Sequence, residues 1–231
     1  MAQKKLYRFN QIKQFSNVLE YPEHMKGNWN RFFKNHNPVC LELACGRGEY
    51  TIGLAQLYPH KNFIGVDIKG NRMYIGAKKA LEDHLHNAGF LRTQIEKLPE
   101  YFEQNEVDEI WITFPDPQLR KSKAKKRLTH PRFLQLYKQI LKPGGWIHLK
   151  TDSPNLFLFT REIIALYGLE LHEEYTDIYS NTSLAPELYI KTHYESMDIA
   201  QSNRIHYLKF SLPETLPVKE DQLKLLVANE E

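Results

Sequence analysis

The feature that most constrains the fold of this 231-residue chain is a regular alternation of short apolar runs with segments of helical periodicity. The apolar runs are rich in strand-forming residues and predict strands at 39–43, 62–66, 89–91, 107–114, 146–150, 169–175 and 204–212. Helical spacing and helix-start residues predict helices over 49–57, 72–85, 131–141 and 153–168, with a short helix near 27–35. This alternation favours an α/β fold with a parallel sheet covered on both faces.

The length and composition fit one domain with flanking segments. We expect a basic N-terminal arm at residues 1–37, a central domain at 38–212 and a polar tail at 213–231. The chain is 42% apolar and 26% charged, as is typical of globular proteins. It contains no apolar run of about 18 residues, so the sequence predicts no transmembrane helix.

Cysteine and histidine usage argues against several other classes. Cys40 and Cys45 are the two cysteines, and their position along one predicted strand and its exit loop fits a reducing cytoplasm better than a disulfide framework. No apolar stretch follows the basic first ten residues, so a secretory signal is not predicted. The ten histidines show no metal-binding spacing, and we expect no metal site.

The loop after the first strand of the predicted domain has the chemistry of a cofactor site. It reads Glu42-Leu43-Ala44-Cys45-Gly46-Arg47-Gly48, and glycines let a backbone approach a ligand closely. The following helix begins with free N–H groups that face the same place. Asp67 ends the next strand, where a carboxylate accepts hydrogen bonds from both hydroxyls of a ribose.

Glycine-rich loops in this place bind two classes of nucleotide cofactor, dinucleotides and S-adenosylmethionine. A dinucleotide site requires the spacing Gly-x-Gly-x-x-Gly, which this loop lacks, and Glu42 would repel a pyrophosphate. A carboxylate at that position favours a cation, such as a sulfonium or an α-ammonium group. The loop resembles that of the class I S-adenosylmethionine-dependent methyltransferases, although Ala44 replaces the usual first glycine. The resemblance implies a Rossmann-like, mostly parallel seven-stranded sheet whose last strand is antiparallel.

Charge is distributed unevenly, although the net charge is only +3. Residues 1–37 hold seven Lys or Arg against two acids, and residues 118–132 hold seven Lys or Arg and no acid. One such run would favour a solvated loop. Two runs flanking a cofactor-binding fold favour a nucleic acid as the partner.

A second candidate site follows the strand at 107–114. There the sequence Phe114-Pro115-Asp116-Pro117 places a carboxylate between two prolines, which favour extended conformations at Phe114 and Asp116. The basic run 118–128 comes next and predicts phosphate binding beside the carboxylate. The alternative is that Asp116 is an ordinary turn residue.

These residues resemble a narrower family, the bacterial tRNA (guanine-N7)-methyltransferases. The similarity lies in Phe-Pro-Asp-Pro at 114–117 with its basic loop, Thr-Asp at 151–152, and Thr-x-Tyr-Glu at 192–195, and it spans about residues 42–210. It implies methyl transfer from S-adenosyl-L-methionine to N7 of the guanine at position 46 in the variable loop of tRNA.

The resemblance also implies roles for individual residues. The cofactor contacts would come from Glu42, Gly46, Gly48, Asp67, Gln94 and Asp116. The substrate contacts would come from Arg120, Asp152, Thr192, His193, Tyr194 and Glu195, with Asp116 as the catalytic or guanine-orienting acid. The chain departs from the family pattern at Gln94, Gln118 and Lys123, which stand where the family usually has Asp, Trp and His.

Guanine N7 has an available lone pair and loses no proton when it is methylated. Catalysis therefore needs positioning and electrostatic stabilisation rather than a strong base. Two alternatives remain at this point. One is a methyltransferase acting on another RNA base or an exocyclic amine, and the other is a non-catalytic RNA-binding protein on the same fold.

Overall fold

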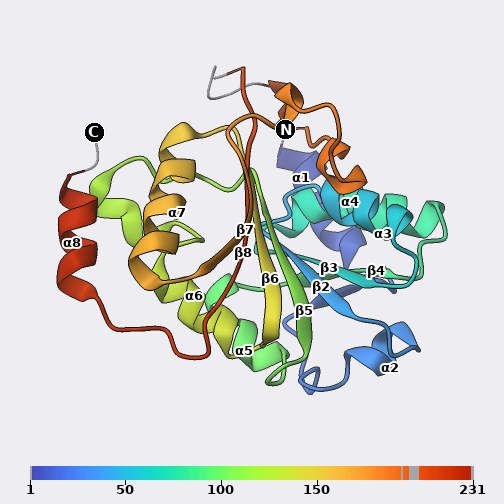
Figure 1. Ribbon diagram of the computed structural model, residues 1–231. Coiled ribbons are helices and arrows are strands. Elements are labelled where there is room, and N and C mark those ends of the chain that lie inside the picture. Colours follow the sequence, from blue (N-terminus) through green and yellow to red (C-terminus); the bar gives the residue numbers. More distant parts are fainter. Residues whose placement is uncertain (1, 194, 198–202, 230–231) are drawn as a thin grey trace.

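The computed structural model describes residues 2–193, 195–197 and 203–229. Among these residues, eight strands form one sheet in the order β1-β4-β3-β2-β5-β6-β8-β7 (Figure 1). The strands are β1 (Val18–Glu20), β2 (Val39–Leu43), β3 (Asn62–Asp67), β4 (Ala88–Arg92), β5 (Val107–Thr113), β6 (Leu141–Thr151), β7 (Glu170–Tyr175) and β8 (His206–Ser211). The helices are α1 (Ala2–Ile12), α2 (Trp29–Phe33), α3 (Glu49–Leu57), α4 (Gly70–Glu82), α5 (Leu98–Tyr101), α6 (Pro131–Lys138), α7 (Pro154–Tyr167) and α8 (Glu220–Ala228).

The sheet confirms the α/β class and the antiparallel last strand. Strands β1 to β6 pair in parallel, and β8 pairs antiparallel with both β6 and β7. The described sheet has one strand more than the predicted seven, because β1 joins β4 from the segment expected to be an arm. Three residues are too few to show strand periodicity, which explains why this edge strand was not predicted.

Helices cover both faces, and each face has its own apolar core. Helices α1, α3 and α4 cover one face, where Ile12, Tyr50 and Met73 belong to one buried cluster. Helices α5, α6 and α7 cover the other, where Phe133 and Phe159 belong to a second. No helix within the described ranges is long and apolar enough to cross a membrane.

Aromatic residues hold the N-terminal segment against the body. Trp29 is only 1% exposed, its indole N–H donates to the backbone oxygen of Tyr101 at 3.0 Å, and its ring stacks on Phe102 at 5.0 Å. Phe32 packs against the Trp29 ring at 5.6 Å. The rings of α2 thus serve packing.

The glycine-rich loop owes its shape to three residues with positive φ at alternate positions. Ala44 has φ +57°, Gly46 +56° and Gly48 +74°. A Cβ atom on Gly48 would lie 2.5 Å from the ring of Phe90 in β4, so glycine is required there for space as well as for conformation. The left-handed conformation at Ala44 carries a cost of about 1 kcal/mol that glycine would avoid.

A pair of substitutions separates these two requirements. Gly144 has the same φ of +74° but open space around its Cβ position. We expect Gly48→Ala to lower the free energy of unfolding by about 3 kcal/mol and Gly144→Ala by about 1 kcal/mol, because only the first also clashes. Urea unfolding measures both values, and equal losses would contradict the close approach of Gly48 to Phe90.

Candidate functional site

A cleft of about 1120 Å³ opens at the carboxyl ends of the central parallel strands. Its walls come from the segments that follow β2, β3, β4, β5 and β6, which is where ligands bind in sheets of this kind. Seven of the predicted site residues line it: Glu42, Gly46, Asp67, Gln94, Asp116, Asp152 and Thr192. The cleft therefore brings together residues that lie up to 150 positions apart in the sequence.

Glu42 is the buried acid of the cleft. It is 3% exposed, and its carboxylate accepts hydrogen bonds from the Thr51 backbone N–H at 2.7 Å and the Thr113 hydroxyl at 2.7 Å, with a further bond from the Thr51 hydroxyl. Burial raises the pKa of Glu42 to about 7, against the opposite effect of these hydrogen bonds. A cation in the cleft would favour the ionised form. Neither threonine was predicted, because their role depends on the tertiary contact with Glu42.

Asp67 connects the ends of two strands. One carboxylate oxygen accepts from the Gly46 N–H at 2.9 Å, and the other accepts from the Lys69 N–H at 2.8 Å. These bonds fix the glycine-rich loop relative to β3. Each oxygen keeps a further lone pair for a ligand hydroxyl.

The Pro-Asp-Pro segment has a conformation that differs from the prediction. Phe114 has φ +47° and is not extended, and Gln118 has φ +49°. The Phe114 N–H still donates to the Lys150 backbone oxygen at 2.8 Å, so the chain leaves the sheet only after this residue and does so abruptly. Two left-handed non-glycine residues around one aspartate mark a strained segment, and such strain is typical of functional sites.

Asp116 itself is exposed in the cleft. One oxygen of its carboxylate accepts from the Gln118 N–H at 3.0 Å, which orients the side chain. The following basic run forms a 3-10 turn, Lys121–Lys126, whose four lysines are all exposed. A cluster of exposed ammonium groups next to a carboxylate suits a phosphate-bearing ligand that also carries a hydrogen-bond donor edge.

One cation of the basic run does not face solvent. Arg127 is 2% exposed, donates to the Gln118 backbone oxygen at 3.3 Å, and lies 4.4 Å from the ring centre of Phe159. The prediction that the whole run binds phosphate is therefore wrong for Arg127, which instead ties the loop to α7. Arg132, beyond the run, lines the cleft and pairs with Glu96 at 3.2 Å.

Four predicted residues lie outside the cleft lining, namely Gly48, Arg120, His193 and Glu195. Gly48 begins α3, and Arg120 is exposed where the lysine-rich turn starts. The Glu195 side chain points inward and pairs with Lys150 at 3.0 Å. Tyr194 is outside the described residues.

The titration of Glu42 gives a test of its burial. Its pKa is raised from 4.5 to about 7, so its stabilising contribution is fully present below pH 4.5 and is lost as the pH rises through 7. We expect the unfolding free energy of the chain to fall relative to that of Glu42→Gln by on the order of 3 kcal/mol across this range. Urea titrations at several pH values measure it, and parallel pH curves would rule out a buried, protonated Glu42.

Comparisons with known proteins agree with this geometry. A family model described as a putative methyltransferase matches residues 36–208. A tRNA (guanine-N(7)-)-methyltransferase of Porphyromonas gingivalis is 50% identical over 192 residues, which cover 82% of this chain and 78% of the relative. A protein of the same name from Bacteroides fragilis is 43% identical over 234 residues, 97% of this chain and 92% of the relative.

Solved structures support the fold. The 16S rRNA methyltransferase KamB aligns with a TM-score of 0.62 at 16% identity, over 83% of this chain and 96% of that one. A variant of the 16S rRNA (adenine(1408)-N(1))-methyltransferase from Catenulisporales acidiphilia, solved with cosubstrate SAM, aligns at 0.54 and 15% identity, over 83% and 93%. With relatives of 42–50% identity over most of its length and this fold, the chain belongs to the tRNA (guanine-N(7)-)-methyltransferase family.

Proposed function

We propose that this protein transfers the methyl group of S-adenosyl-L-methionine to N7 of a guanine in the variable loop of tRNA. One observation carries the proposal: one cleft is lined by the buried acid Glu42 in its interior and by the exposed Asp116, which precedes a lysine-rich turn. Membership in the family supports the same reaction.

The residues of the inner end fit the cofactor. Glu42, with a pKa near 7, would hold a positively charged ligand, and Asp67 would accept from ribose hydroxyls. Gln94 is exposed in the cleft and would meet the adenine with both a donor and an acceptor. When bound, S-adenosylmethionine supplies an electrophilic methyl group.

Asp116 would act on the guanine rather than on a proton at N7. Its carboxylate would accept hydrogen bonds from the guanine N1–H and amino group, which adenine does not offer in that pattern. The methylated base carries a positive charge, and a nearby carboxylate stabilises that charge as it develops. Selection of guanine and stabilisation of the product charge would therefore come from one side chain.

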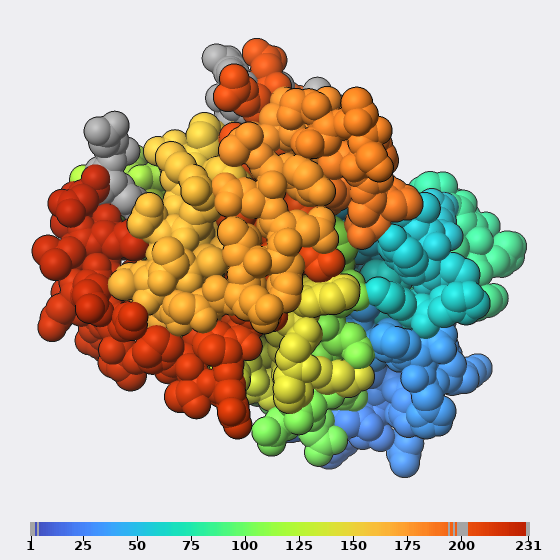
Figure 2. Space-filling model, viewed as in Figure 1, coloured from blue at the N-terminus to red at the C-terminus, as the bar shows by residue number. Residues whose placement is uncertain are grey.

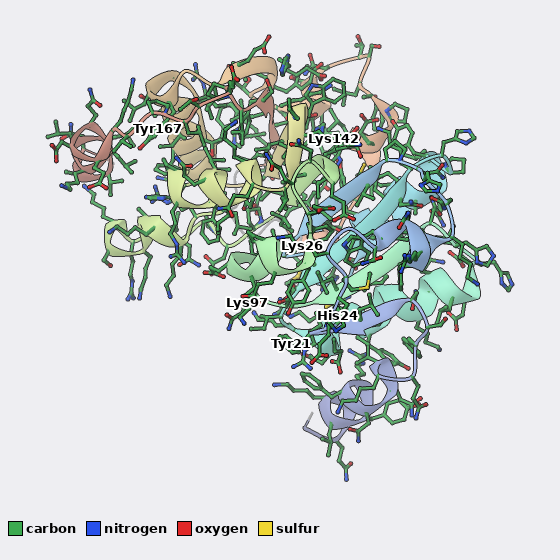
Figure 3. All side chains as sticks on the ribbon, turned by 90° about the horizontal axis from the view of Figure 1, so that it is seen from below. Tyr21, His24, Lys26, Lys97, Lys142 and Tyr167 are labelled. Atoms are coloured by element: carbon green, nitrogen blue, oxygen red, sulfur yellow. The ribbon has the colours of Figure 1, made fainter. Side chains whose placement is uncertain are left out.

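The exposed lysines of the turn Lys121–Lys126 would bind the tRNA backbone. One lysine of the N-terminal segment, Lys26, lies away from the cleft. Lys26 precedes Gly27, whose N–H donates to Glu106 at 3.0 Å just before the amino end of β5. Figure 3, which shows the molecule from below, labels Lys26 and Lys142 at the amino ends of the strands, opposite the cleft.

Substitution of Asp116 tests its proposed role. We expect Asp116→Ala and Asp116→Asn to lower kcat on tRNA by a hundredfold or more, because neither keeps the negative charge. The resemblance implies a cofactor contact for Asp116 as well, and calorimetric titration separates the two roles: a Kd for S-adenosylmethionine within threefold of the wild-type value assigns Asp116 to the guanine. Asp221→Asn, at an exposed position in α8, serves as the control with normal turnover. Near-normal turnover in both Asp116 variants would contradict the role.

Salt dependence tests the basic turn. Replacing Lys123, Lys125 and Lys126 by Ala is expected to weaken tRNA binding and to reduce the slope of log K against log salt by about 2, since three phosphate contacts are lost. The matched control replaces three lysines that do not line the cleft, Lys26, Lys34 and Lys142, by Ala. A slope that is equal in both variants would place the tRNA elsewhere.

A further inference from the structure

Lys150, near the end of β6, is a buried cation that the sequence did not mark as functional. Its side chain has 0% exposure, and its ammonium donates to the backbone oxygens of Leu188 at 2.9 Å and Ile190 at 2.8 Å and to the Glu195 carboxylate at 3.0 Å. An ammonium has three N–H donors, so none remains for a ligand. Burial lowers the pKa of Lys150, and the Glu195 charge opposes that effect.

The Glu195 side chain is also buried, and both of its carboxylate oxygens accept hydrogen bonds. Its side chain is 4% exposed, and its second carboxylate oxygen accepts from the hydroxyl of Tyr179. Its backbone N–H donates to the hydroxyl oxygen of Thr192 at 3.1 Å. The resemblance implied that Glu195 contacts the substrate, but its carboxylate is held by Lys150 and Tyr179 and does not line the cleft.

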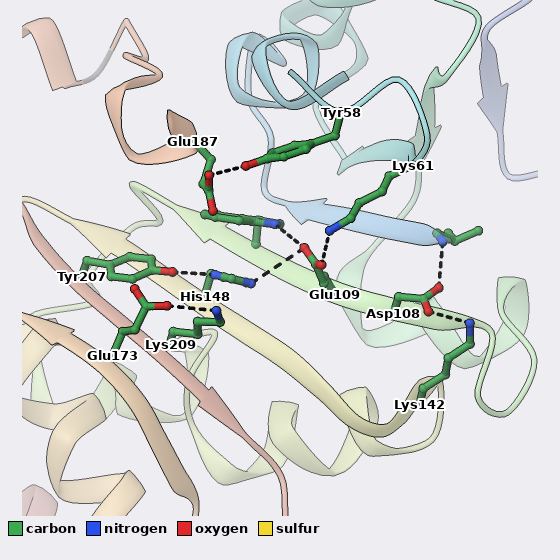
Figure 4. Close-up of polar contacts among 12 residues, drawn as sticks. Tyr58, Lys61, Asp108, Glu109, Lys142, His148, Glu173, Glu187, Tyr207 and Lys209 are labelled. Atoms are coloured by element: carbon green, nitrogen blue, oxygen red, sulfur yellow. Dashed lines mark hydrogen bonds and ion pairs between the residues drawn. The ribbon is translucent and has the colours of Figure 1, made fainter. Parts of the chain in front are cut away.

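Residues 186–193 and 195, which we call the strap, begin with the 3-10 turn Pro186–Tyr189, which packs against helix α3. The Tyr50 hydroxyl donates to the Glu187 backbone oxygen at 2.6 Å, and the Tyr58 hydroxyl donates to the Glu187 carboxylate (Figure 4). In the space-filling view the orange surface of this part of the chain adjoins the cyan surface that includes α3 (Figure 2). The strap is thus fixed to α3 at its start and to β6 by Lys150.

The consequence of this anchoring is the position of Thr192. In the sequence, Thr192 follows Ile190, whose carbonyl contacts Lys150, and precedes Glu195, whose carboxylate contacts the same ammonium. Thr192 lines the cleft together with Asp116 and Asp152. Asp152 follows Lys150 by two residues and comes directly after the same strand. One strand end therefore supplies both a cleft carboxylate and the cation that holds the opposite segment.

We propose that Lys150 and Glu195 form a positioning pair that holds the strap so that Thr192 faces the guanine site. The proposal rests on the function proposed above. Neither side chain of the pair touches the reacting atoms, and Glu195 contributes to methyl transfer through Thr192 rather than by contact with the base.

A kinetic cycle tests the proposal. Lys150→Met keeps an unbranched side chain that is one atom shorter but removes the three donors, and kcat/KM for tRNA is expected to fall tenfold or more. The Kd for S-adenosylmethionine, measured by calorimetry, is expected to stay within threefold. Adding Thr192→Ala to Lys150→Met is expected to cause little further loss in kcat/KM, because both changes remove the same contact of Thr192 with the guanine site. Additive losses would overturn the proposal.

Glu195→Gln separates an anchor from a base contact. An amide still accepts a hydrogen bond from Lys150 and has the same shape, so we expect a loss in kcat/KM below tenfold. A loss above a hundredfold, with Lys150→Met nearly normal, would show direct contact between Glu195 and the guanine. This variant also remains informative if Lys150→Met does not fold.

Limited trypsin digestion reports on the strap without any reaction. Lys191 is exposed within it, and its cleavage, followed by mass spectrometry, is expected to be at least fivefold faster in Lys150→Met than in wild type. Lys209→Met removes a more exposed ion pair, between Lys209 of β8 and Glu173 at 2.9 Å, and serves as the control (Figure 4). Unchanged cleavage at Lys191 would overturn the anchoring. Absence of 7-methylguanine with the wild-type protein would instead overturn the proposed function, while the digestion result still decides the anchoring.

Discussion

The hydrogen bonds of the buried Glu42 carboxylate connect the elements on which the rest of the site depends. Glu42 belongs to β2, while its partners Thr51 and Thr113 belong to α3 and β5. A buried carboxylate without partners would be strongly destabilising, so these bonds fix the glycine-rich loop, the first helix after it and the central strand relative to one another. The same burial keeps the pKa of Glu42 near 7, which leaves the group responsive to a cationic ligand.

The outer half of the cleft is built by different means. There the backbone is strained at Phe114 and Gln118, and the surrounding contacts must hold it. Arg127 ties the basic loop to the Gln118 backbone and to Phe159 of α7, and Lys150 holds the strap through the Leu188 backbone oxygen. Both cations are buried and keep two irregular segments in place, although Arg127 belongs to a run that predicts phosphate binding in the sequence. The exposed Lys123, Lys125 and Lys126, which precede Arg127, would meet phosphates.

Much of this arrangement follows from sequence patterns. Apolar runs predict the strands of the central sheet. The rule that ligands bind beyond the carboxyl ends of parallel strands predicts that Glu42, Asp67 and Asp116 share one site, and all three line the cleft. Patterns along the chain cannot show what a charged side chain pairs with after folding, which is why the burial of Arg127 and the inward orientation of Glu195 were not predicted. Proline rules describe average preferences, and the hydrogen bond from Phe114 to β6 overrides them. Residues 18–20 were not recognised as a strand because their pairing with β4 depends on tertiary contact.

The central claim is that one cleft places an S-adenosylmethionine methyl group against guanine N7 of tRNA. The most direct measurement is incubation of the protein with tRNA lacking 7-methylguanine and with labelled S-adenosylmethionine, followed by chemical cleavage at 7-methylguanine and mapping of the labelled position. The account predicts one labelled guanine, in the variable loop, with the label at N7. Label on an exocyclic amine or on another base, or no transfer at all by protein that binds the cofactor, would contradict it.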